Sequence, residues 1–278
     1  MNYKNGTYTG ERALFKTKDA KIEGSVFKDG ESPLKESSDL DISNVSFEWK
    51  YPLWYCNNVK VDKSVFLETA RSGIWYTNNI EITNSDISAP KTFRRSTYIT
   101  LKNCDIPNAQ ETLWGCDHVK MENIKVKGDY LGLNAKNVEI NNLYLDGNYC
   151  FDGGENIVIR NSILNSKDSF WNSKNVLIEN CEIDGEYIAW NSENLTFKNC
   201  TISSHQGFCY IKNLTLINCV LKNCKLVFEY CENVNIDANS TIDSIKNPIS
   251  GKIVSKGIDE IIYDDPNIDK NKTEVKFK

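Results

Sequence analysis

A repeat of nineteen to twenty-one residues runs along most of the 278-residue sequence and constrains its fold more than any other feature. The pattern Asn-Leu-Thr-Phe-Lys-Asn-Cys-Thr-Ile, which starts at Asn194, has a close match nineteen residues earlier and another nineteen residues later. A fixed short period is typical of a solenoid whose units stack on their neighbours. Extending the register gives twelve repeats, which start at Asp19, Asp39, Asn58, Asn79, Tyr98, His118, Asn137, Asn156, Asn175, Asn194, Asn213 and Asn233.

Apolar residues within each repeat alternate with a period of two, which is the pattern of a half-buried β-strand. Offsets one and three from the first position are apolar throughout, as in Val176 and Ile178, and offset eight is apolar as well, as in Ile183. A third apolar or small position, such as Phe170, precedes the next repeat. The sequence therefore predicts an all-β protein, a single-stranded parallel β-helix of about twelve coils with three short strands per coil.

The repeat divides the chain into three parts. Residues 1–18 precede the first repeat and are predicted to cap the stack, where an unpaired strand edge would otherwise be exposed. Residues 19–250 are predicted to form the parallel β-helix as one domain. The pattern fades after Ile242, so residues 251–278 are predicted to form a C-terminal cap and a charged, loosely held tail.

Charge and hydropathy exclude several classes of function. The net charge of −5 and the pI near 5.3 argue against nucleic-acid binding, which requires an excess of Lys and Arg. No apolar leader opens the sequence and no apolar run approaches the length of a membrane span, so we expect a cytoplasmic protein without a membrane partner. The sequence identifies no cofactor, and no cluster of residues has the spacing of a metal site.

Asn occupies offset five in nine of the repeats, between the first two predicted strands. Because Asn tolerates left-handed backbone geometry and can pair with its copy one coil away, we expect an internal ladder at a corner. Cys104, Cys181, Cys200 and Cys219 follow this Asn at offset six. Adjacent copies would lie at the strand spacing of about 4.8 Å, which permits disulfides. The expected cytoplasmic location favours reduced thiols instead.

Five of the six tryptophans share one repeat position, directly after the middle residue of the third predicted strand. Residues two positions earlier are mostly small, as at Gly73, so the indoles are predicted to wall an outward-facing trough. One interpretation is a ligand surface that stacks on sugar rings, and the other is packing under the protein's own loops or against a second subunit, in a monomer or a homodimer. The five residues are Trp54, Trp75, Trp114, Trp171 and Trp190.

Positive charges gather on the turn that leads into this face. A site for a carboxylated sugar or a phosphate is one interpretation, because Arg and Lys recognise such groups. Neutralisation by nearby carboxylates such as Glu31 is the other, and Glu111 aligns with one of the lysines as a simple salt pair. The positive residues are Lys50, Arg71, Lys91, Arg94 and Arg95.

Acidic side chains follow on later coils. Asp168 and Glu186 lie on adjacent coils one column apart, and Asp152 lies one coil earlier. Pairs of carboxylates at suitable separations perform acid and base roles in glycoside hydrolases, so these three are candidate catalytic residues. Lys167 shares a column with Glu186, and an ion pair between them is the alternative.

The coil pattern over residues 19–250 resembles the pectin-lyase-like right-handed β-helix superfamily. Several segments resemble, more closely, a bacterial family of unknown function with this predicted fold. The superfamily resemblance implies a right-handed helix and polysaccharide lyase or hydrolase chemistry. The segments are Gly-Glu-Ser-Pro-Leu-Lys-Glu at 30–36, Lys-Tyr-Pro-Leu-Trp-Tyr at 50–55, Gly-Ile-Trp-Tyr at 73–76, Lys-Asp-Ser-Phe-Trp-Asn at 167–172, Gly-Glu-Tyr at 185–187 and Lys-Asn-Pro at 246–248.

The sequence departs from both catalytic patterns of that superfamily. The hydrolase set of Asn-Thr-Asp, Asp-Asp and Gly-His-Gly is not present, and the lyase pattern is met only loosely by Arg71, Lys91, Arg94 and Arg95. In a lyase, Arg94, Arg95 or Lys91 would supply the base. The leading hypothesis is a carbohydrate-interacting protein, a lyase or hydrolase acting on an acidic oligosaccharide. The alternative is a non-enzymatic interaction module that uses the tryptophan face as a protein interface.

Overall fold

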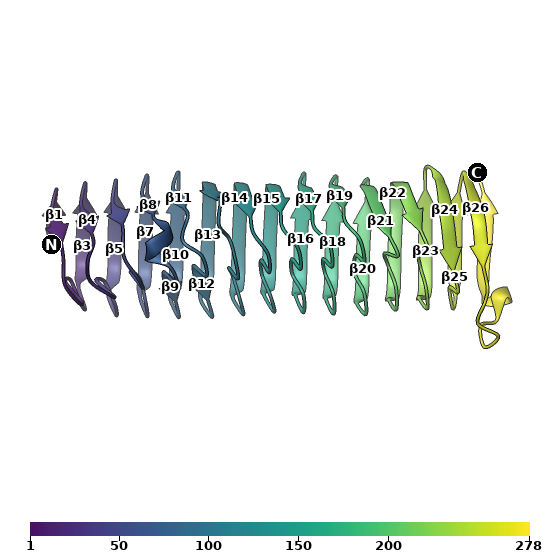
Figure 1. Cartoon of the computed structure of the whole chain (residues 1–278), viewed down its shortest axis with the longest axis horizontal. Coiled ribbons are helices and arrows are strands. Elements are labelled where there is room, and N and C mark those ends of the chain that lie inside the picture. The colour runs from purple at the N-terminus through teal and green to yellow at the C-terminus, as the bar shows by residue number, and fades with distance from the viewer. The chain divides into compact units, whose positions relative to one another are not determined.

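Each coil of the chain contains a first strand, a sharp corner, a shorter second strand and a turn that leads to the next coil. The structure, a computed structural model, describes all residues from Met1 to Lys278 and shows a parallel β-solenoid of about fifteen coils without an α-helix. Two compact units are present, residues 1–144 and 145–278. Within each unit the corresponding strands of successive coils pair in parallel (Figure 1).

Unit 1 begins with five coils in which the two strands are separate and continues with three coils in which they merge. The first strands are β1 (Asn2–Lys4), β3 (Lys18–Glu23), β5 (Ser38–Ser43), β7 (Asn57–Asp62) and β10 (Asn78–Thr83). The second strands are β2 (Thr7–Tyr8), β4 (Val26–Phe27), β6 (Ser46–Phe47), β8 (Val65–Phe66) and β11 (Asp86–Ile87). The merged strands are β13 (Thr97–Ile106), β14 (Asp117–Lys127) and β15 (Lys136–Asp146), whose last two residues belong to unit 2. One 3₁₀ turn, η1 (Glu68–Ala70), interrupts the series.

Unit 2 repeats the same plan. Its first strands are β16 (Glu155–Arg160), β18 (Lys174–Glu179), β20 (Glu193–Lys198), β23 (Glu232–Ala238), β25 (Gly251–Ser255) and β27 (Thr273–Phe277). Its second strands are β17 (Ile163–Asn165), β19 (Glu182–Asp184), β21 (Thr201–His205), β24 (Thr241–Lys246) and β26 (Gly257–Ile262). β22 (Lys212–Lys225) covers both positions of one coil, and η2 (Lys270–Lys272) is a single 3₁₀ turn. No helix of the structure has the length and apolar composition that crossing a membrane would require.

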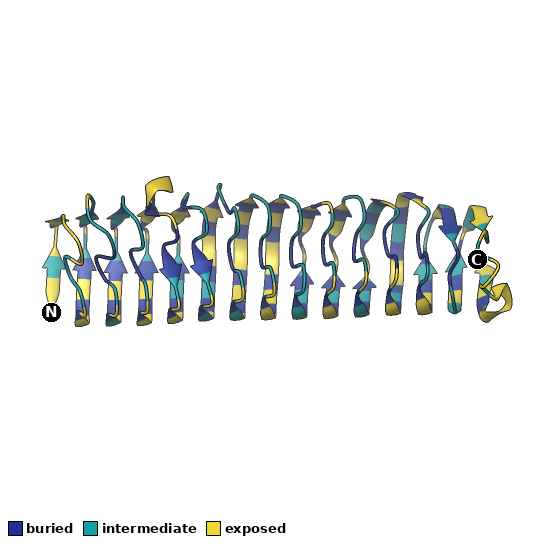
Figure 2. Ribbon diagram, turned by 60° about the horizontal axis from the view of Figure 1, so that its bottom comes forward, coloured by how far each residue is buried: buried dark blue, intermediate teal, exposed yellow.

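The two-residue alternation predicted from the sequence is confirmed by the strand register. Ile80 of β10 pairs with Val59 on one side and with Ile99 on the other, and all three are buried. The residues between these apolar positions are less buried, which produces the alternating bands of Figure 2. The register is kept through most coils and shifts locally where β22 pairs with β21 and β23, so one continuous apolar face lies inside each unit.

The interior of each unit is filled by side chains that stack on their own copies one coil away. Phe47 lies between Phe27 and Phe66, with ring centroids 5.4 and 4.6 Å apart, and none of the three is more than 2% exposed. In unit 2, Phe151 and Phe170 stack in the same way at 5.9 Å. Parallel in-register pairing makes such stacks possible because it aligns like residues at the strand spacing of about 4.8 Å.

The coil count predicted from the sequence is too low, since the repeat extends in both directions beyond its predicted limits. Residues 1–17 are not merely a lead-in, because Tyr3 of β1 pairs with Ile22 and Tyr8 of β2 pairs with Phe27. At the other end β25, β26 and β27 continue the pairing. The tail expected to be loosely held instead contributes β27, which pairs with β25. Tyrosines and irregular spacing at these ends hide the apolar pattern in the sequence.

The Asn ladder predicted at the corner is present, but it lies outside the coil and not inside it. Asn180 and Asn199 adopt left-handed backbone geometry, with φ of 55° and 52°, and their side chains are exposed. Asn199 Nδ2 donates to Asn180 Oδ1 at 3.1 Å, and Asn218 Nδ2 donates to Asn199 Oδ1 at 2.7 Å. The left-handed residue turns its side chain outward, so the amides form a hydrogen-bonded row on the surface.

The third side of the coil, which was expected to be a strand, consists mostly of tight turns. Only β9 (Ile74–Trp75) and β12 (Phe93–Arg94) pair there as strands. The turns satisfy their backbone groups across coils, as when the Trp75 carbonyl accepts a hydrogen bond from Tyr55 N–H at 3.0 Å. This side carries the tryptophans and leads away from the second strand, so it determines where the candidate site residues lie.

Candidate functional site

The tryptophan column predicted from the sequence forms a stack in each unit. In unit 1, Trp54 and Trp75 stack with ring centroids 5.1 Å apart and planes within 8°. The guanidinium of Arg94 comes next and lies 4.6 Å from the ring centroids of both Trp75 and Trp114. In unit 2, Trp171 and Trp190 stack at 5.6 Å. The flat faces of most of these rings are therefore covered by one another or by Arg94.

The indole N–H groups are also satisfied within the protein. Trp75 Nε1 donates to the Lys91 carbonyl at 2.8 Å, and Trp190 Nε1 donates to the Gln206 carbonyl at 2.8 Å. The same contact to the next coil is made by Trp54, Trp114 and Trp171. Each indole is half-buried, so ring edges remain as the accessible part of the column.

The trough predicted beside the tryptophans is absent. Its small residues were expected to face outward, but Gly73, Thr92, Thr112 and Ser169 are all buried. The prediction assumed strand alternation, whereas two successive residues of each turn point inward, as Gly73 and Ile74 do. The outer face beside the indoles thus has no row of small residues to form a floor.

The positive cluster of unit 1 is largely neutralised by carboxylates, which confirms the salt-pair interpretation. Lys50 Nζ lies 3.2 Å from Glu31 Oε1. Glu111 Oε2 lies 3.0 Å from Lys91 Nζ and 3.4 Å from an Arg94 nitrogen. Arg71 and Arg95 are exposed and form no ion pair.

The three acids proposed from the sequence do not meet at one site. Lys167 Nζ lies 3.1 Å from Glu186 Oε2, so the predicted ion pair is confirmed. Asp152 Oδ1 accepts a hydrogen bond from Asn172 Nδ2 at 2.9 Å, on the side of the coil that carries the tryptophans. Glu186 lines a surface hollow, described next, whose lining includes neither Asp152 nor Asp168.

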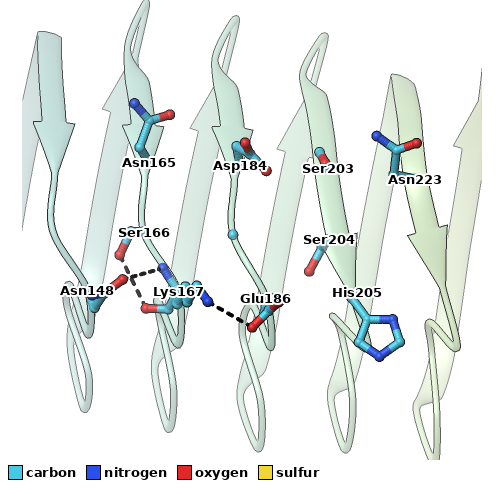
Figure 3. A pocket seen from close by; sticks show the side chains of 11 residues that line it. Asn148, Asn165, Ser166, Lys167, Asp184, Glu186, Ser203, Ser204, His205 and Asn223 are labelled. Atoms are coloured by element: carbon cyan, nitrogen blue, oxygen red, sulfur yellow. Dashed lines mark hydrogen bonds and ion pairs between the residues drawn. The ribbon is translucent and has the colours of Figure 1, made fainter.

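One hollow of unit 2, with a volume of about 420 Å³, gathers polar side chains from successive coils, and we call it the polar groove (Figure 3). Two rows of side chains flank it, one at or near the ends of the second strands and one about two residues further along the chain. The first row consists of Asn165, Asp184, Ser203 and Asn223. The second row consists of Asn148, Lys167, Glu186 and His205.

Small residues between the two rows form the floor of the polar groove. Ser166, Gly185 and Ser204 occupy this position on three successive coils. A Cβ atom added at Gly185 would lie 2.0 Å from the Ser166 carbonyl oxygen, so only glycine fits there. Ser204 is 2% exposed and its Oγ has no hydrogen-bond partner in the protein. A buried hydroxyl without a partner is costly to the folded state.

Sequence reasoning found one pair of this groove and missed the rest. Lys167 and Glu186 were placed in one column, but Asp184 and His205 were not recognised as site residues. The signal was present at offsets nine to eleven, which read Asn-Ser-Lys, Asp-Gly-Glu and Ser-Ser-His from residues 165, 184 and 203. When a small residue lies between two polar ones in consecutive repeats, near the end of a strand, the pattern predicts a polar groove.

The carboxyl group of Asp168, beside the groove, has a perturbed ionisation. Partial burial, followed by repulsion from Glu186, raises the pKa of Asp168, and Lys167 opposes the shift. A raised pKa in the folded state means that this group favours folding at low pH and that the contribution is lost as pH rises through the folded pKa.

Asp168→Asn is therefore expected to increase the free energy of unfolding at about pH 7, and the gain is expected to shrink at about pH 3. Asn also accepts the positive φ of 52° at this position, so the backbone adds no penalty. Urea unfolding of both proteins at the two pH values measures the difference. An equal gain at both values would contradict the assignment to this carboxyl group.

The fold is that of a parallel β-solenoid protein with a polar groove on its surface. The chain belongs to a family of unknown function, DUF3737 (protein of unknown function), whose model matches residues 1–276. This confirms the resemblance to a family with a pectin-lyase-like fold. No protein with a curated description matches the sequence.

Solved structures with a similar fold include proteins of different activities. The surface adhesin PfbA of Streptococcus pneumoniae matches with a TM-score of 0.50 at 11% identity over 84% of each chain. The A-module of the Azotobacter vinelandii mannuronan C-5 epimerase AlgE4 matches with a TM-score of 0.30 at 9% identity, over 96% of this chain and 90% of that one. The catalytic domain of a GH87 α-1,3-glucanase matches with a TM-score of 0.38 at 12% identity, over 97% of this chain and 62% of that one. At 11% identity the likeness to PfbA establishes the fold alone.

Proposed function

We propose that this protein binds an oligosaccharide, which lies along the polar groove of unit 2 across several coils. The observation that supports the proposal best is the floor of small residues between two rows of amide, carboxylate and hydroxyl side chains. Such groups hydrogen-bond to sugar hydroxyls, and each recurs at the strand spacing of about 4.8 Å, so successive sugar units meet similar partners.

The charges of the groove favour a neutral sugar over an acidic one. Asp184 is exposed and has no ion-pair partner, whereas the charge of Glu186 is balanced by Lys167. Anionic ligands would be repelled by the remaining carboxylate. The basic cluster that suggested an acidic oligosaccharide lies in unit 1 and is mostly paired with Glu31 and Glu111. The groove also contains carboxyl groups that hydrolysis would require, so cleavage products belong in the same assay.

The competing role for the tryptophan column, as a protein interface, has less support. The rings already stack on each other and their N–H groups have partners, so a partner protein would gain only edge contacts. We interpret the column as an internal stabilising stack. A cytoplasmic location stays a prediction from the sequence.

Asp184→Ala is expected to weaken binding of a groove ligand by about 10- to 100-fold, because a hydrogen bond to a charged group contributes about 1.5–3 kcal/mol. Isothermal titration with a panel of neutral and acidic oligosaccharides measures Kd for the parent and the variant. Asp152→Ala is the matched control, since Asp152 lies outside the groove and bonds to Asn172. Binding that is lost equally in both variants, or that favours acidic sugars, would count against the proposal.

A further inference from the structure

Three cysteines of unit 2 occupy one interior column on three successive coils. Cys181 and Cys200 follow β18 and β20, and Cys219 lies within β22. The Cys181 carbonyl accepts a hydrogen bond from Thr201 N–H at 3.0 Å, and the Cys200 carbonyl accepts one from Val220 N–H at 2.9 Å. These bonds place the three residues in register on adjacent coils, about 4.8 Å apart. That spacing lies within the Cα separations of about 4.4–6.8 Å found in disulfides.

The three residues of the column are free thiols on successive coils. All ten cysteines of the chain are free and buried. Cys181 Sγ donates a hydrogen bond to the Ile159 carbonyl at 3.8 Å, and Cys200 Sγ donates one to the Ile178 carbonyl at 3.5 Å. The Cys200 thiol lowers the pKa of Cys181, although burial opposes the shift. The Cys181 thiol and burial raise the pKa of Cys200 to about 11, although Cys219 opposes the shift, so Cys181 ionises more easily than Cys200.

A surface hollow lies beside one end of the column. This hollow of unit 2, of about 460 Å³, is lined by Cys181 together with Asn180, Glu182, Asn199 and other polar groups, whereas neither Cys200 nor Cys219 lines it. Cys181 is also the most exposed of the three, at 4% against 2% and 0%. Cys181 is therefore the thiol of the column that lies closest to the solvent, and Cys200 lies on the next coil.

We propose that Cys181 and Cys200 form a thiol redox site that reacts with a hydroperoxide. The Cys181 thiolate attacks the terminal oxygen of the peroxide, the O–O bond breaks, and the sulfur is oxidised to a sulfenic acid while the leaving oxygen departs as an alcohol or water. The Cys200 sulfur then attacks the sulfenic sulfur, an S–S bond forms, and the hydroxyl leaves as water with the Cys200 proton. Two electrons pass from the two thiols to the peroxide.

A disulfide suits this position better than a bound soft metal ion. A metal ion of charge +1 held by two thiolates would leave a net negative charge in the apolar interior, which is costly to bury. The disulfide is neutral and would join two residues that already lie in register on adjacent coils. Serine occupies the same repeat position at Ser85 and Ser162, so replacement of one of these cysteines by serine is compatible with the coil.

The test is oxidation of the intact, reduced protein with hydrogen peroxide, followed by alkylation and peptide mass spectrometry. We expect a Cys181–Cys200 disulfide to form at least about tenfold faster than Cys104 is oxidised. Cys104 is the matched control, because it has the same position and the same 4% exposure but lies between Ser85 and Ile124. In Cys200→Ser, the Cys181 sulfenic acid should persist and be trapped by dimedone.

Oxidation of Cys104 at the same rate as Cys181 would overturn the proposal, as would a Cys200→Ser protein that folds but yields no dimedone adduct. The disulfide map of the parent protein needs no variant, so it decides the question even if that variant does not fold. A metal site would replace the redox site if two results were found together. Ag⁺ would bind stoichiometrically and protect Cys181 and Cys200 from peroxide, and peroxide alone would form no disulfide between them. The disulfide map and the dimedone adduct are both measured without a sugar ligand. Failure of the redox proposal can therefore be distinguished from failure of the proposed sugar binding in the polar groove.

Discussion

Replacement of Phe47 by alanine is expected to lower the free energy of unfolding of unit 1 by about 3–5 kcal/mol, the usual cost of removing a fully buried phenylalanine. Phe47 is 0% exposed and lies between Phe27 and Phe66, so the cavity would open in the middle of a three-ring stack. The neighbouring coils are held by strand pairing and cannot collapse into the space. Urea unfolding followed by circular dichroism measures the change.

The control for this prediction is Phe277→Ala in β27. Phe277 is 61% exposed, so its loss should change the free energy of unfolding by less than about 0.5 kcal/mol. A similar effect of both substitutions would mean that stacking inside the coil contributes little, and that strand pairing alone holds the fold.

Trp75→Ala is expected to destabilise unit 1 by about 3 kcal/mol, less than a fully buried ring because Trp75 is half-buried. The substitution removes the stack on Trp54, the contact with the Arg94 guanidinium and the hydrogen bond to the Lys91 carbonyl. Binding in the polar groove should be unchanged, since Trp75 does not line it. Thermal unfolding and isothermal titration on the same protein separate the two effects.

Trp49→Ala is the matched control, because Trp49 is the one tryptophan outside the column. It is half-buried as well, and its recorded ring contact is the Lys50 ammonium at 5.2 Å. We expect a loss of only about 1 kcal/mol. If Trp75→Ala instead left stability unchanged and abolished sugar binding, the column would be a ligand surface and our interpretation of it as an internal stack would be wrong.

The strands could be predicted from the sequence because their signal is local. Val176, Ile178 and Ile183 are apolar at the positions that parallel pairing buries, and each has a copy one repeat away. The same alignment correctly paired Lys167 with Glu186, since two residues nineteen apart lie side by side when the register does not shift. Both successes need only the period and the two-residue alternation.

The directions of side chains in the turns could not be predicted in this way. The prediction from the sequence took the third side of the coil to be a strand, which would place the Thr92 side chain outside. In the structure Lys91 and Arg95 have left-handed backbone geometry, which redirects the chain and leaves Thr92 buried. The polar groove depends on similar turns after Asp184 and Ser203. No single residue of the groove indicates a site in the sequence. The site forms only because the turn geometry places two rows of polar side chains on either side of Gly185.

The backbone and amide contacts between coils have a consequence for how the gene of such a protein can change. Asn194 bonds to Asn175, and Asn213 bonds to Asn194, in both cases nineteen residues apart, while other rungs of the amide rows are twenty or twenty-one residues apart. Excision of one whole coil would bring equivalent groups together again, whereas excision of half a coil would leave the strands on either side of the cut without matching partners. Insertions and deletions that survive in the stacked region should therefore be quantised in whole turns.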